Sequence, residues 1–378
     1  MSEKLIIEDF GPIKKMSFDF KKINVLIGDQ GTGKSTVAKL LSVIKEVTVF
    51  PEMNLHINGK PAGQDEIMDA FLIEFKKQLE NFGILNYLKT DTFIEFSDSF
   101  AYLKYENQRI DVKGNLQEQK SKHTFLIGFI PAYREAVVLL KDSLNAIAAV
   151  GAPLPKFFYY FGQSVINAKK AKSLYNYTDI LNVKYKYVNG DDVIILNNGQ
   201  EILIEEASSA VNSAIPLLTV FDTSVELNYP TDRTVSHNTN CPYIIIEEPE
   251  LNCFPATQKK MIEYFIAKLK YETANGFDYY CRLVITTHSP YILATLNNLM
   301  YAHEVGKTNG EEVENNIKIA KKYWLNPDDV SVYQLLTDGT YENIMDEELK
   351  QIKVEKIDEI SEVLSKQWHE LADLNFDK

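Results

Sequence analysis

Eight consecutive residues near the N-terminus have the types and the spacing of a phosphate-binding loop. They fit the pattern G-x-x-x-x-G-K-[ST], whose glycines let the backbone wrap closely around a phosphate and point its N–H groups inward. In this pattern the lysine reaches the β- and γ-phosphates, and the hydroxyl that follows, here Ser35, is a ligand for Mg²⁺. The residues that we predict to bind a nucleotide here are Gly28, Asp29, Gln30, Gly31, Thr32, Gly33, Lys34, Ser35 and Thr36.

Acidic residues follow an apolar stretch in the second half of the chain. Tyr243 to Ile246 are apolar, and the sequence continues with Glu247, Glu248, Pro249 and Glu250. We expect a buried strand that lies beside the strand of the phosphate-binding loop. Glu247 would hold Mg²⁺ through water, and Glu248 would orient and polarise an attacking water molecule. Acids end many strands, so this interpretation depends on the loop upstream.

Two polar clusters add further candidates. The strand-like stretch 282–286 runs into Thr287, His288 and Ser289, and ligands bind at the carboxyl ends of parallel strands. His288 is therefore a candidate to contact the γ-phosphate, although a lone histidine is more often structural. Ser208 and Ser209 begin a helical stretch, where serines either form an anion site or serve as an ordinary cap.

The elements that must position these residues alternate between strands and helices. Apolar residues 23–27 predict a buried strand before the loop, and Val37, Leu40, Leu41 and Ile44 share one face of a helix after it. This alternation predicts an α/β fold. Further strands are expected at 5–7, 17–20, 92–96, 100–105, 109–112, 125–130, 184–188, 193–196, 201–205 and 330–336.

We expect one domain over residues 1–378, with additions to a nucleotide-binding core. The additions are an inserted α+β segment at 51–124, a helical and β lobe at 133–206 before the serines, and an acidic C-terminal helical tail at 338–378. Helices are predicted at 65–82, 207–221, after Pro255, after Pro290 and at 354–374, and a loop at 223–241.

Composition limits the class of protein. With 378 residues, 45% of them apolar, the chain can bury a sizeable core. The three cysteines lack metal or disulfide spacing, the N-terminus lacks a signal-peptide pattern, and no apolar run approaches the ~18 residues of a membrane span. These features predict a cytoplasmic protein without membrane contact. The net charge of −13 argues against a chain coated in nucleic acid but allows a local basic patch.

Residues 156–187 form such a basic stretch. They contain six lysines, one aspartate and nine Phe or Tyr residues. Lysines neutralise phosphates and aromatic faces stack on bases, so the stretch could bind DNA or RNA. The alternative is an amphipathic lobe whose aromatics are core and whose lysines are a solvated face.

Taken together, the motifs resemble the ATP-binding-cassette (ABC) ATPases, in the branch that includes RecF, SMC heads and the OLD-type ATPases. The resemblance implies a P-loop NTPase fold of the ABC-ATPase head type, with a mixed sheet as its core, and the motifs cover most of this chain. The segments similar to that branch are Phe-Gly-Pro-Ile at 10–13, Ile-Pro-Ala-Tyr-Arg at 130–134, the signature-like Ala-Ser-Ser-Ala at 207–210, Glu-Glu-Pro-Glu at 247–250 with Pro255 and Gln258, and Thr-Thr-His-Ser-Pro at 286–290.

The resemblance implies ATP and Mg²⁺ as ligands and a head-to-tail dimer. In such a dimer each ATP lies between the loop of one subunit and the serines of the other, and hydrolysis at Glu248 releases the pair. Three departures predict slow hydrolysis more than weak binding. Ala210 stands where the signature has glycine, Glu247 replaces the usual aspartate, and no glutamine is assigned to the Q-loop.

The resemblance also supports hypotheses about biological function. Short heads of this kind are similar to ATPase subunits of prokaryotic anti-phage defence systems, which act with a separate nuclease or toxin as effector. No segment is left over for a nuclease domain of this chain's own, so the effector is expected to be another protein. The alternatives are a RecF-like repair ATPase that binds DNA directly and a regulatory ATPase without nucleic acid.

Overall fold

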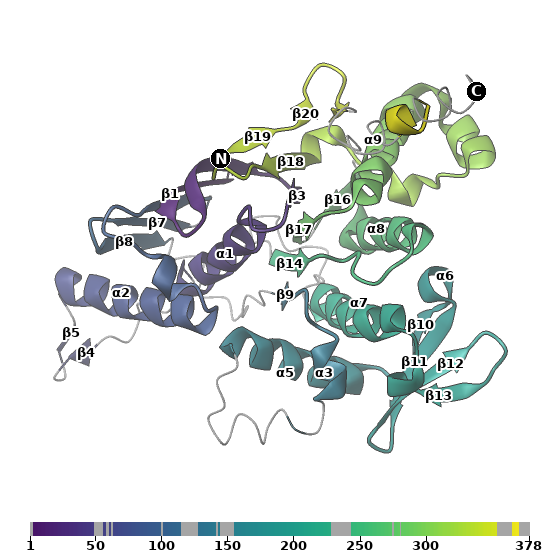
Figure 1. Cartoon of the computed structure of the whole chain (residues 1–378), viewed down its shortest axis with the longest axis horizontal. Coiled ribbons are helices and arrows are strands. Elements are labelled where there is room, and N and C mark those ends of the chain that lie inside the picture. The colour runs from purple at the N-terminus through teal and green to yellow at the C-terminus, as the bar shows by residue number, and fades with distance from the viewer. Residues whose placement is uncertain are drawn as a thin grey trace, which may run out of the picture.

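A six-stranded mixed sheet forms the centre of the computed structural model (Figure 1), in the order β19-β18-β3-β17-β14-β9. All neighbours are parallel except β18 and β19. The strands are β3 (Ile23–Gly28), β9 (Gly128–Ile130), β14 (Tyr243–Glu247), β17 (Arg282–Thr287), β18 (Val330–Leu335) and β19 (Tyr341–Asn343). The predicted α/β fold with a mixed sheet is confirmed. The structure describes residues 3–48, 56–57, 60–61, 63–99, 101–114, 128–140, 143, 155–227, 243–273, 276–279, 281–353 and 365–369.

The strand order corrects one prediction. The strand that ends in the acid pair, β14, does not lie beside the loop strand β3, because β17 pairs with both. All five residues of β14 are buried, as is typical of a strand covered on both faces. The two strands were predicted to be neighbours from only two motifs, the phosphate-binding loop and the acid pair. The apolar stretch before His288 forms the strand between them.

A second, antiparallel sheet has the order β2-β1-β6-β7-β8. Its strands are β1 (Glu3–Phe10), β2 (Ile13–Phe20), β6 (Phe93–Ser97), β7 (Ala101–Glu106) and β8 (Arg109–Gly114). Strands β6, β7 and β8 of segment 51–124 therefore continue a sheet that the N-terminus begins, whereas His56–Ile57 and Lys60–Pro61 of that segment pair only with each other. Residues 49–55, 58–59, 62, 100 and 115–127 lie outside the described part, and the boundaries of this segment stay a prediction.

Helices cover the sheets. Helix α1 (Lys34–Thr48) contacts strands of both sheets as well as α2 (Gln64–Asn81), and Figure 1 shows it between the two sheets. Eleven of its fifteen residues are buried, which accounts for the apolar face predicted from sequence. Helices α8 (Pro255–Leu269) and α9 (Pro290–Glu312) pack against each other.

The lobe begins after β9. It contains α3 (Ala136–Leu139), α5 (Lys156–Ala171), β10 (Tyr175–Tyr177), α6 (Thr178–Leu181), β11 (Val183–Val188), β12 (Asp191–Leu196) and β13 (Glu201–Leu203). The last helix of this region, α7 (Ser209–Leu227), packs against α5 and β9. It is longer than predicted, so residues 223–227 are helical rather than loop, and 228–241 lie outside the described part.

Smaller elements complete the chain. They are β4 (His56–Ile57), β5 (Lys60–Pro61), β15 (Lys270–Thr273), β16 (Gly276–Tyr279), β20 (Met345–Asp346) and β21 (Gln351–Ile352), with short helical turns at Leu85–Tyr87, Ile204–Glu206, Val313–Ile317, Lys321–Tyr323 and Pro327–Asp329. Of the predicted helix at 354–374, only residues 365–369 are described, and they are helical. No helix in the described ranges has the length and apolar character that crossing a membrane requires.

Candidate active site

The phosphate-binding loop connects β3 to α1. Gly28 and Gly33 have φ angles of 152° and 100°, which side chains rarely tolerate. A Cβ at Gly28 would come within 2.3 Å of the Leu335 carbonyl oxygen, so this position requires glycine. Thr32 Oγ1 donates to the Asp29 carbonyl at 2.9 Å and braces the turn. The sequence thus folds locally into the cradle that its glycine spacing predicts.

Lys34 lies inside this cradle. Its Nζ donates to the carbonyl oxygens of Gly28 and Asp29 at 2.7 and 2.8 Å, and the residue is 5% exposed. Burial lowers the pKa of Lys34 to about 8, although the charges of Glu248, Asp29 and Glu250 oppose this shift. A buried ammonium that contacts neutral carbonyls is available to pair with a phosphate, which would supply the missing counter-charge.

Glu247 ends β14 and is 2% exposed. Its Oε2 accepts a hydrogen bond from the Ala132 amide at 3.2 Å, whereas Oε1 is buried without a hydrogen-bond partner. Burial raises the pKa of Glu247, opposed by Lys39, the Ser35 hydroxyl and the Ala132 N–H. The residues fit Mg²⁺, because a carboxylate oxygen without a partner lies with a hydroxyl at the loop and both are hard oxygen donors. The two residues predicted to hold metal are therefore neighbours.

Glu248 adopts an unusual backbone conformation. Its φ angle is 45°, in the left-handed region that costs a non-glycine residue about 1–3 kcal/mol. Its amide donates to the Thr286 carbonyl at 2.8 Å, and one carboxylate oxygen lies 3.5 Å from His288 Nε2. The side chain is 28% exposed, so water can reach it. Strain of this kind is found at positions where function fixes a side-chain direction.

His288 lies between the loop and the acid. Its Nδ1 is 3.5 Å from Lys34 Nζ, and its Nε2 faces Glu248. An ammonium has only donors, so these contacts suit the tautomer that carries its hydrogen on Nε2. The position of His288 follows from the strand order, because β17 separates the loop strand from the acid strand. Lys34, His288 and Glu248 thus form one row.

Three groups that hold this row in place were not predicted from the sequence to do so. They are Glu250, the pair of Ser289 and Gln258, and Arg134. Glu250 Oε1 accepts hydrogen bonds from the Thr287 hydroxyl and the His288 amide, both at 2.7 Å, and burial raises the pKa of Glu250. Ser289 donates to Gln258 at 2.5 Å. Glu250 was visible in the motif, but its role depends on the neighbouring strand, which the local sequence does not reveal.

Arg134 is the third group. The prediction noted it within a motif, yet the structure gives it a specific place, fully buried beside the acid pair. Its Nη1 donates to the Glu247 carbonyl at 2.8 Å and its Nη2 to the Glu248 carbonyl at 2.9 Å. Burial lowers the pKa of Arg134 to about 10, opposed chiefly by Cys253 and Glu250. The guanidinium therefore stays charged at neutral pH.

The two signature-like serines are elsewhere. Ser209 begins α7, and Ser208 Oγ accepts a hydrogen bond from the Val211 amide at 3.4 Å, as a cap does. Both residues are exposed, and within the described ranges no hydrogen bond or ion pair joins them to Lys34, Glu248 or His288. One chain therefore brings together the loop, the acids and the histidine but not the serines, whose role in ATP binding stays a prediction.

The basic stretch 156–187 is largely a packed lobe. Most of its aromatic side chains are buried, namely Phe157, Phe158, Phe161, Tyr175, Tyr177 and Tyr185. Lys169 forms an ion pair with Asp192 at 2.6 Å, and Lys172 and Lys186 pair with Glu226 and Glu201. Lys156, Lys170 and Lys184 remain exposed. The described side chains favour the alternative in which the aromatics are core.

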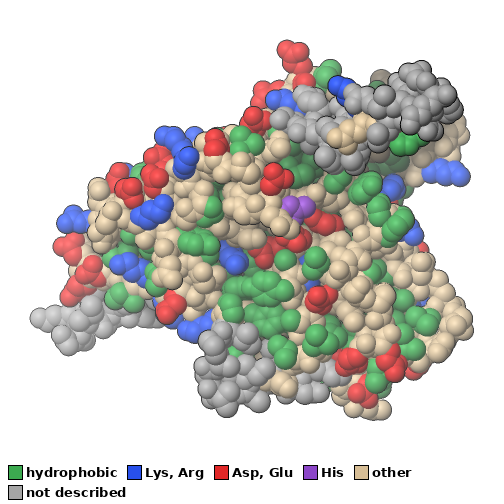
Figure 2. Space-filling model, viewed as in Figure 1, with side chains coloured by type: hydrophobic (Ala, Val, Ile, Leu, Met, Phe, Trp, Pro, Cys, Tyr) green, Lys and Arg blue, Asp and Glu red, His purple; other side chains and the backbone are tan. Residues whose placement is uncertain are grey.

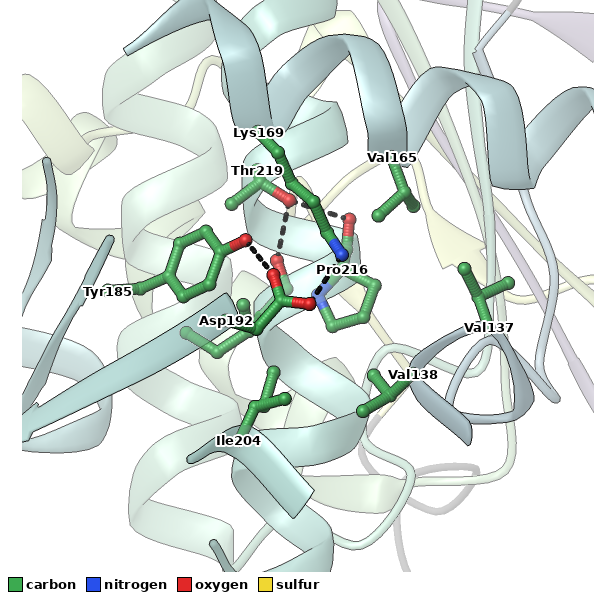
Figure 3. Close-up of a pocket in the computed structure, with 10 residues that line it drawn as sticks. Val137, Val138, Val165, Lys169, Tyr185, Asp192, Ile204, Pro216 and Thr219 are labelled. Carbon is green, nitrogen blue, oxygen red and sulfur yellow. Dashed lines mark hydrogen bonds and ion pairs between the residues drawn. The ribbon is translucent and has the colours of Figure 1, made fainter. Parts of the chain in front are cut away.

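The pair of Lys169 and Asp192 borders a small cavity beneath α7 (Figure 3). The cavity has a volume of about 10 Å³, and its wall is mostly apolar, with Pro216 and Thr219 of α7 on one side. Tyr185 also donates to Asp192, at 2.5 Å. A space of this size holds about one water molecule, so it is a packing defect rather than a ligand site.

Figure 2 shows acidic side chains and a histidine gathered at the centre of one face, above an apolar patch.

Comparison with known proteins agrees with an ATPase. Residues 140–293 match the AAA ATPase domain family, and this range contains the serines, the acid pair and His288. No curated protein matches the chain.

Several solved structures are similar in outline. The SMC head domain from Thermotoga maritima is 10% identical, covers 78% of this chain and 92% of its own, and gives a TM-score of 0.39. An SMC head bound to the C-terminal winged-helix domain of ScpA is 10% identical, with coverages of 90% and 96% and a TM-score of 0.43. The recombination mediator RecF of the RecFOR pathway is 11% identical, with coverages of 91% and 98% and a TM-score of 0.39.

The features described above come from separate parts of the chain. The loop holds a buried lysine that pairs with no carboxylate among the described residues. Strands β17 and β14 supply a histidine and an acid that face each other, and residues 140–293 match an ATPase domain. Together these features are those that a nucleotide-hydrolysing site requires, and residues 140–293 are similar to the AAA ATPase domain family.

Proposed function

We propose that the protein is a slow ATPase that uses ATP to join two copies head to tail, and that this switch controls a separate effector. The observation that carries the dimer is the division of the site. Lys34, Glu248 and His288 form one row, whereas Ser208 and Ser209 of the same chain lie exposed without contact to it. A second copy could supply serines to this row, and the first would do the same in return.

The chain's own residues suggest how hydrolysis proceeds. The phosphates of ATP replace the Gly28 and Asp29 carbonyls as partners of Lys34, and the loop amides add further hydrogen bonds. Ser35 and Glu247 would hold Mg²⁺, which when bound neutralises phosphate charge. Glu248 accepts the proton of the attacking water, and His288 holds that carboxylate in place while facing the lysine.

Three features support slow rather than fast turnover. Glu248 depends on a strained backbone, Glu247 is longer than the usual aspartate, and Ala210 adds a methyl group where a signature glycine would let the backbone approach a phosphate. Each of these affects the geometry of hydrolysis more than the cradle that binds ATP. A long-lived ATP state would suit a switch better than a motor.

The effector proposal rests on the resemblance to ATPase subunits of anti-phage defence systems. In this proposal the protein works in the cytoplasm, and a nuclease or toxin on another polypeptide responds to opening or closing of the dimer. The alternatives are a RecF-like DNA-repair ATPase and a regulatory ATPase without nucleic acid. A neighbouring gene for a nuclease or toxin would favour the effector proposal. Salt-dependent DNA binding would separate the RecF-like ATPase from the regulatory ATPase without nucleic acid.

Mixing two inactive variants tests the head-to-tail dimer. Lys34→Ala removes the phosphate partner, and Ser209→Arg places a bulky cation where the other subunit's nucleotide would dock. If the motifs combine between chains, a mixed dimer has one doubly damaged site and one intact site. We expect hydrolysis to reappear on mixing, and ATP-dependent dimers to appear by light scattering. Mixtures as inactive as each variant alone would contradict this arrangement. Exposed Lys260, changed to Ala, serves as a control for Lys34→Ala.

Nucleic-acid binding needs a different set of substitutions. Lys169 belongs to a buried ion pair, so reversing it would damage the lobe itself. Changing the exposed Lys156, Lys170 and Lys184 to Glu is the cleaner test. If the stretch binds duplex DNA, each lost phosphate contact should reduce the log–log salt slope by about 0.9. If wild-type protein binds no DNA or RNA at low salt, with or without ATP, the hypothesis that residues 156–187 bind nucleic acid is refuted.

A further inference from the structure

The charge of Arg134 is buried, and it forms no ion pair with the residues that the structure describes. It is 0% exposed, and its hydrogen bonds among the described residues all go to backbone carbonyls. Desolvating a charge costs several kcal/mol, and a well-packed apolar residue is often at least as stabilising. Stability alone therefore gives little reason for an arginine here. What it does provide is a rigid, planar set of donors that joins separate segments of the chain.

One edge of the guanidinium holds the turn after β14. Nη1 donates to the Glu247 carbonyl at 2.8 Å, and Nη2 donates to the Glu248 carbonyl at 2.9 Å. Glu248 is the residue with a φ angle of 45°, and its carbonyl also accepts from the Leu251 amide at 3.1 Å. These bonds compensate for the left-handed conformation and so fix the direction in which the Glu248 carboxylate leaves the backbone.

The other edge holds α7. Nε donates to the Ser213 carbonyl at 3.0 Å, in the helical turn that Ser209 begins. Pro216 lies inside this helix and has no N–H, so the Asn212 carbonyl lacks its usual helical partner. Asn212 Oδ1 and Ser213 Oγ are buried without hydrogen-bond partners. The serine-bearing turn is thus joined less firmly to the rest of α7, while Arg134 ties it directly to β14.

We propose that Arg134 is a positioning residue that keeps Glu248 in its productive conformation and links it to the serine-bearing turn of α7. The proposal rests on the roles proposed above for Glu248 and Ser209. In a head-to-tail dimer that turn meets the partner's nucleotide, whereas Glu248 serves the nucleotide of its own chain. Arg134 would then let the occupancy of one ATP site set the geometry of the base at the other.

Arg134→Lys is the most informative substitution. A lysine keeps the charge, but its compact ammonium cannot donate to Ser213, Glu247 and Glu248 in the same fixed plane. We expect kcat to fall by about 10- to 100-fold, because displacements near 1 Å cost that much in catalysis. KM for ATP should stay within about threefold, since the phosphate loop is not touched. Arg282→Lys is the matched control, because Arg282 also makes a close contact at 2.8 Å, with Glu3, away from the site.

A double-mutant cycle separates positioning from general damage. Glu248→Gln alone tests the proposed function, and we expect it to slow hydrolysis by about 10²- to 10⁴-fold. In that background Arg134→Lys should cause no further loss, because a residue that acts through Glu248 has nothing left to position. Normal turnover of Glu248→Gln would refute the base assignment. Two outcomes with a slow Glu248→Gln variant would refute the positioning role alone. One is that Arg134→Lys by itself leaves kcat unchanged, and the other is that it lowers kcat by the same factor in the Glu248→Gln background as in wild type.

A second measurement leaves Arg134 intact, in case its variants do not fold. Pro216→Ala restores an N–H that the Asn212 carbonyl can accept, and so should stiffen the first turns of α7. Hydrogen exchange of the peptide 247–254 should then slow by about threefold or more together with that of 209–216, whereas 255–269 should not change. Slower exchange confined to α7 would overturn the link.

Discussion

Two groups of buried and half-buried charges lie at opposite ends of the same strands, and their charges are satisfied in different ways. At the amino ends, Lys45 Nζ lies 3.1 Å from Glu3 and 2.7 Å from Asp98, and Arg282 lies 2.8 Å from Glu3. Tyr243, which begins β14, presents its ring to both cations. Here each charge has an opposite charge beside it.

At the carboxyl ends, the charges face neutral groups. Among the described residues, Lys34 donates to two carbonyls and Arg134 donates only to carbonyls. Glu247 has one amide donor there and one buried oxygen without a hydrogen-bond partner. Burial raises the pKa of Glu247 and lowers that of Lys34. Such groups gain most from a ligand that brings phosphate oxygens and a cation together.

The difference distinguishes structural charges from functional ones. Both groups include buried acids, and burial raises the pKa of Glu3 as well, despite the opposing charges of Lys45 and Arg282. A shifted pKa therefore does not identify the site. The identity of the contacts does, because charges already paired within the chain have little to offer a ligand.

The largest effect should come from breaking the paired group. Lys45→Met removes the cation that contacts both Glu3 and Asp98, and removing one partner of a buried pair costs about 3–5 kcal/mol. We expect a large loss in the free energy of unfolding, measured by urea denaturation, with kcat for ATP little changed in the folded protein. A variant as stable as wild type would show that this group does not stabilise the fold.

Glu247→Gln is the matched change at the other end. The amide removes a buried charge that forms no ion pair with the described residues, so stability without nucleotide should stay within about 1 kcal/mol of wild type or rise. Hydrolysis should fall by about 10²-fold or more, because the remaining group binds Mg²⁺ poorly. Urea denaturation gives the free energy of unfolding, and a single-turnover assay on the same preparation gives the rate of ATP hydrolysis. Loss of stability with normal hydrolysis would reverse the comparison.

The sequence was most informative where a motif is local. The glycine spacing predicted the loop around Lys34, and apolar periodicity predicted α1, because both depend on neighbouring residues. Glu247, Glu248 and His288 were selected from strand ends, and the structure places them near Lys34. Their order in space was wrong, because which strand lies between two others is decided by packing across the sheet.

Long-range partners could not be derived from the sequence. Arg134 bonds to residues more than 75 positions away, and Glu250 acts on the neighbouring strand. The basic stretch 156–187 shows the same limit from the other side. Its lysines suggested a surface for nucleic acid, but Asp192, Glu201 and Glu226, which pair with three of them, lie outside the stretch. Composition counts charges but does not reveal which of them meet.

The smallest effect should be the pH dependence of ATP affinity, which tests whether Lys34 is held ready for a ligand. Burial lowers the pKa of Lys34 to about 8, so the ammonium is charged at pH 7 and loses its proton as the pH rises through 8. Binding needs the charged form, and above pH 8 the protein must take up a proton to bind ATP. We expect affinity to be nearly constant from pH 6.5 to about 7.5 and to fall about tenfold per pH unit well above 8. Titration calorimetry in buffers of different ionisation enthalpy would detect that proton uptake.

Lys45, whose ammonium pairs with carboxylates, provides the control for this prediction, since Lys45→Arg should leave the pH profile of ATP affinity unchanged. A profile in wild type that stays flat to pH 9.5 would mean that Lys34 already has its counter-charge, as the structural lysine does.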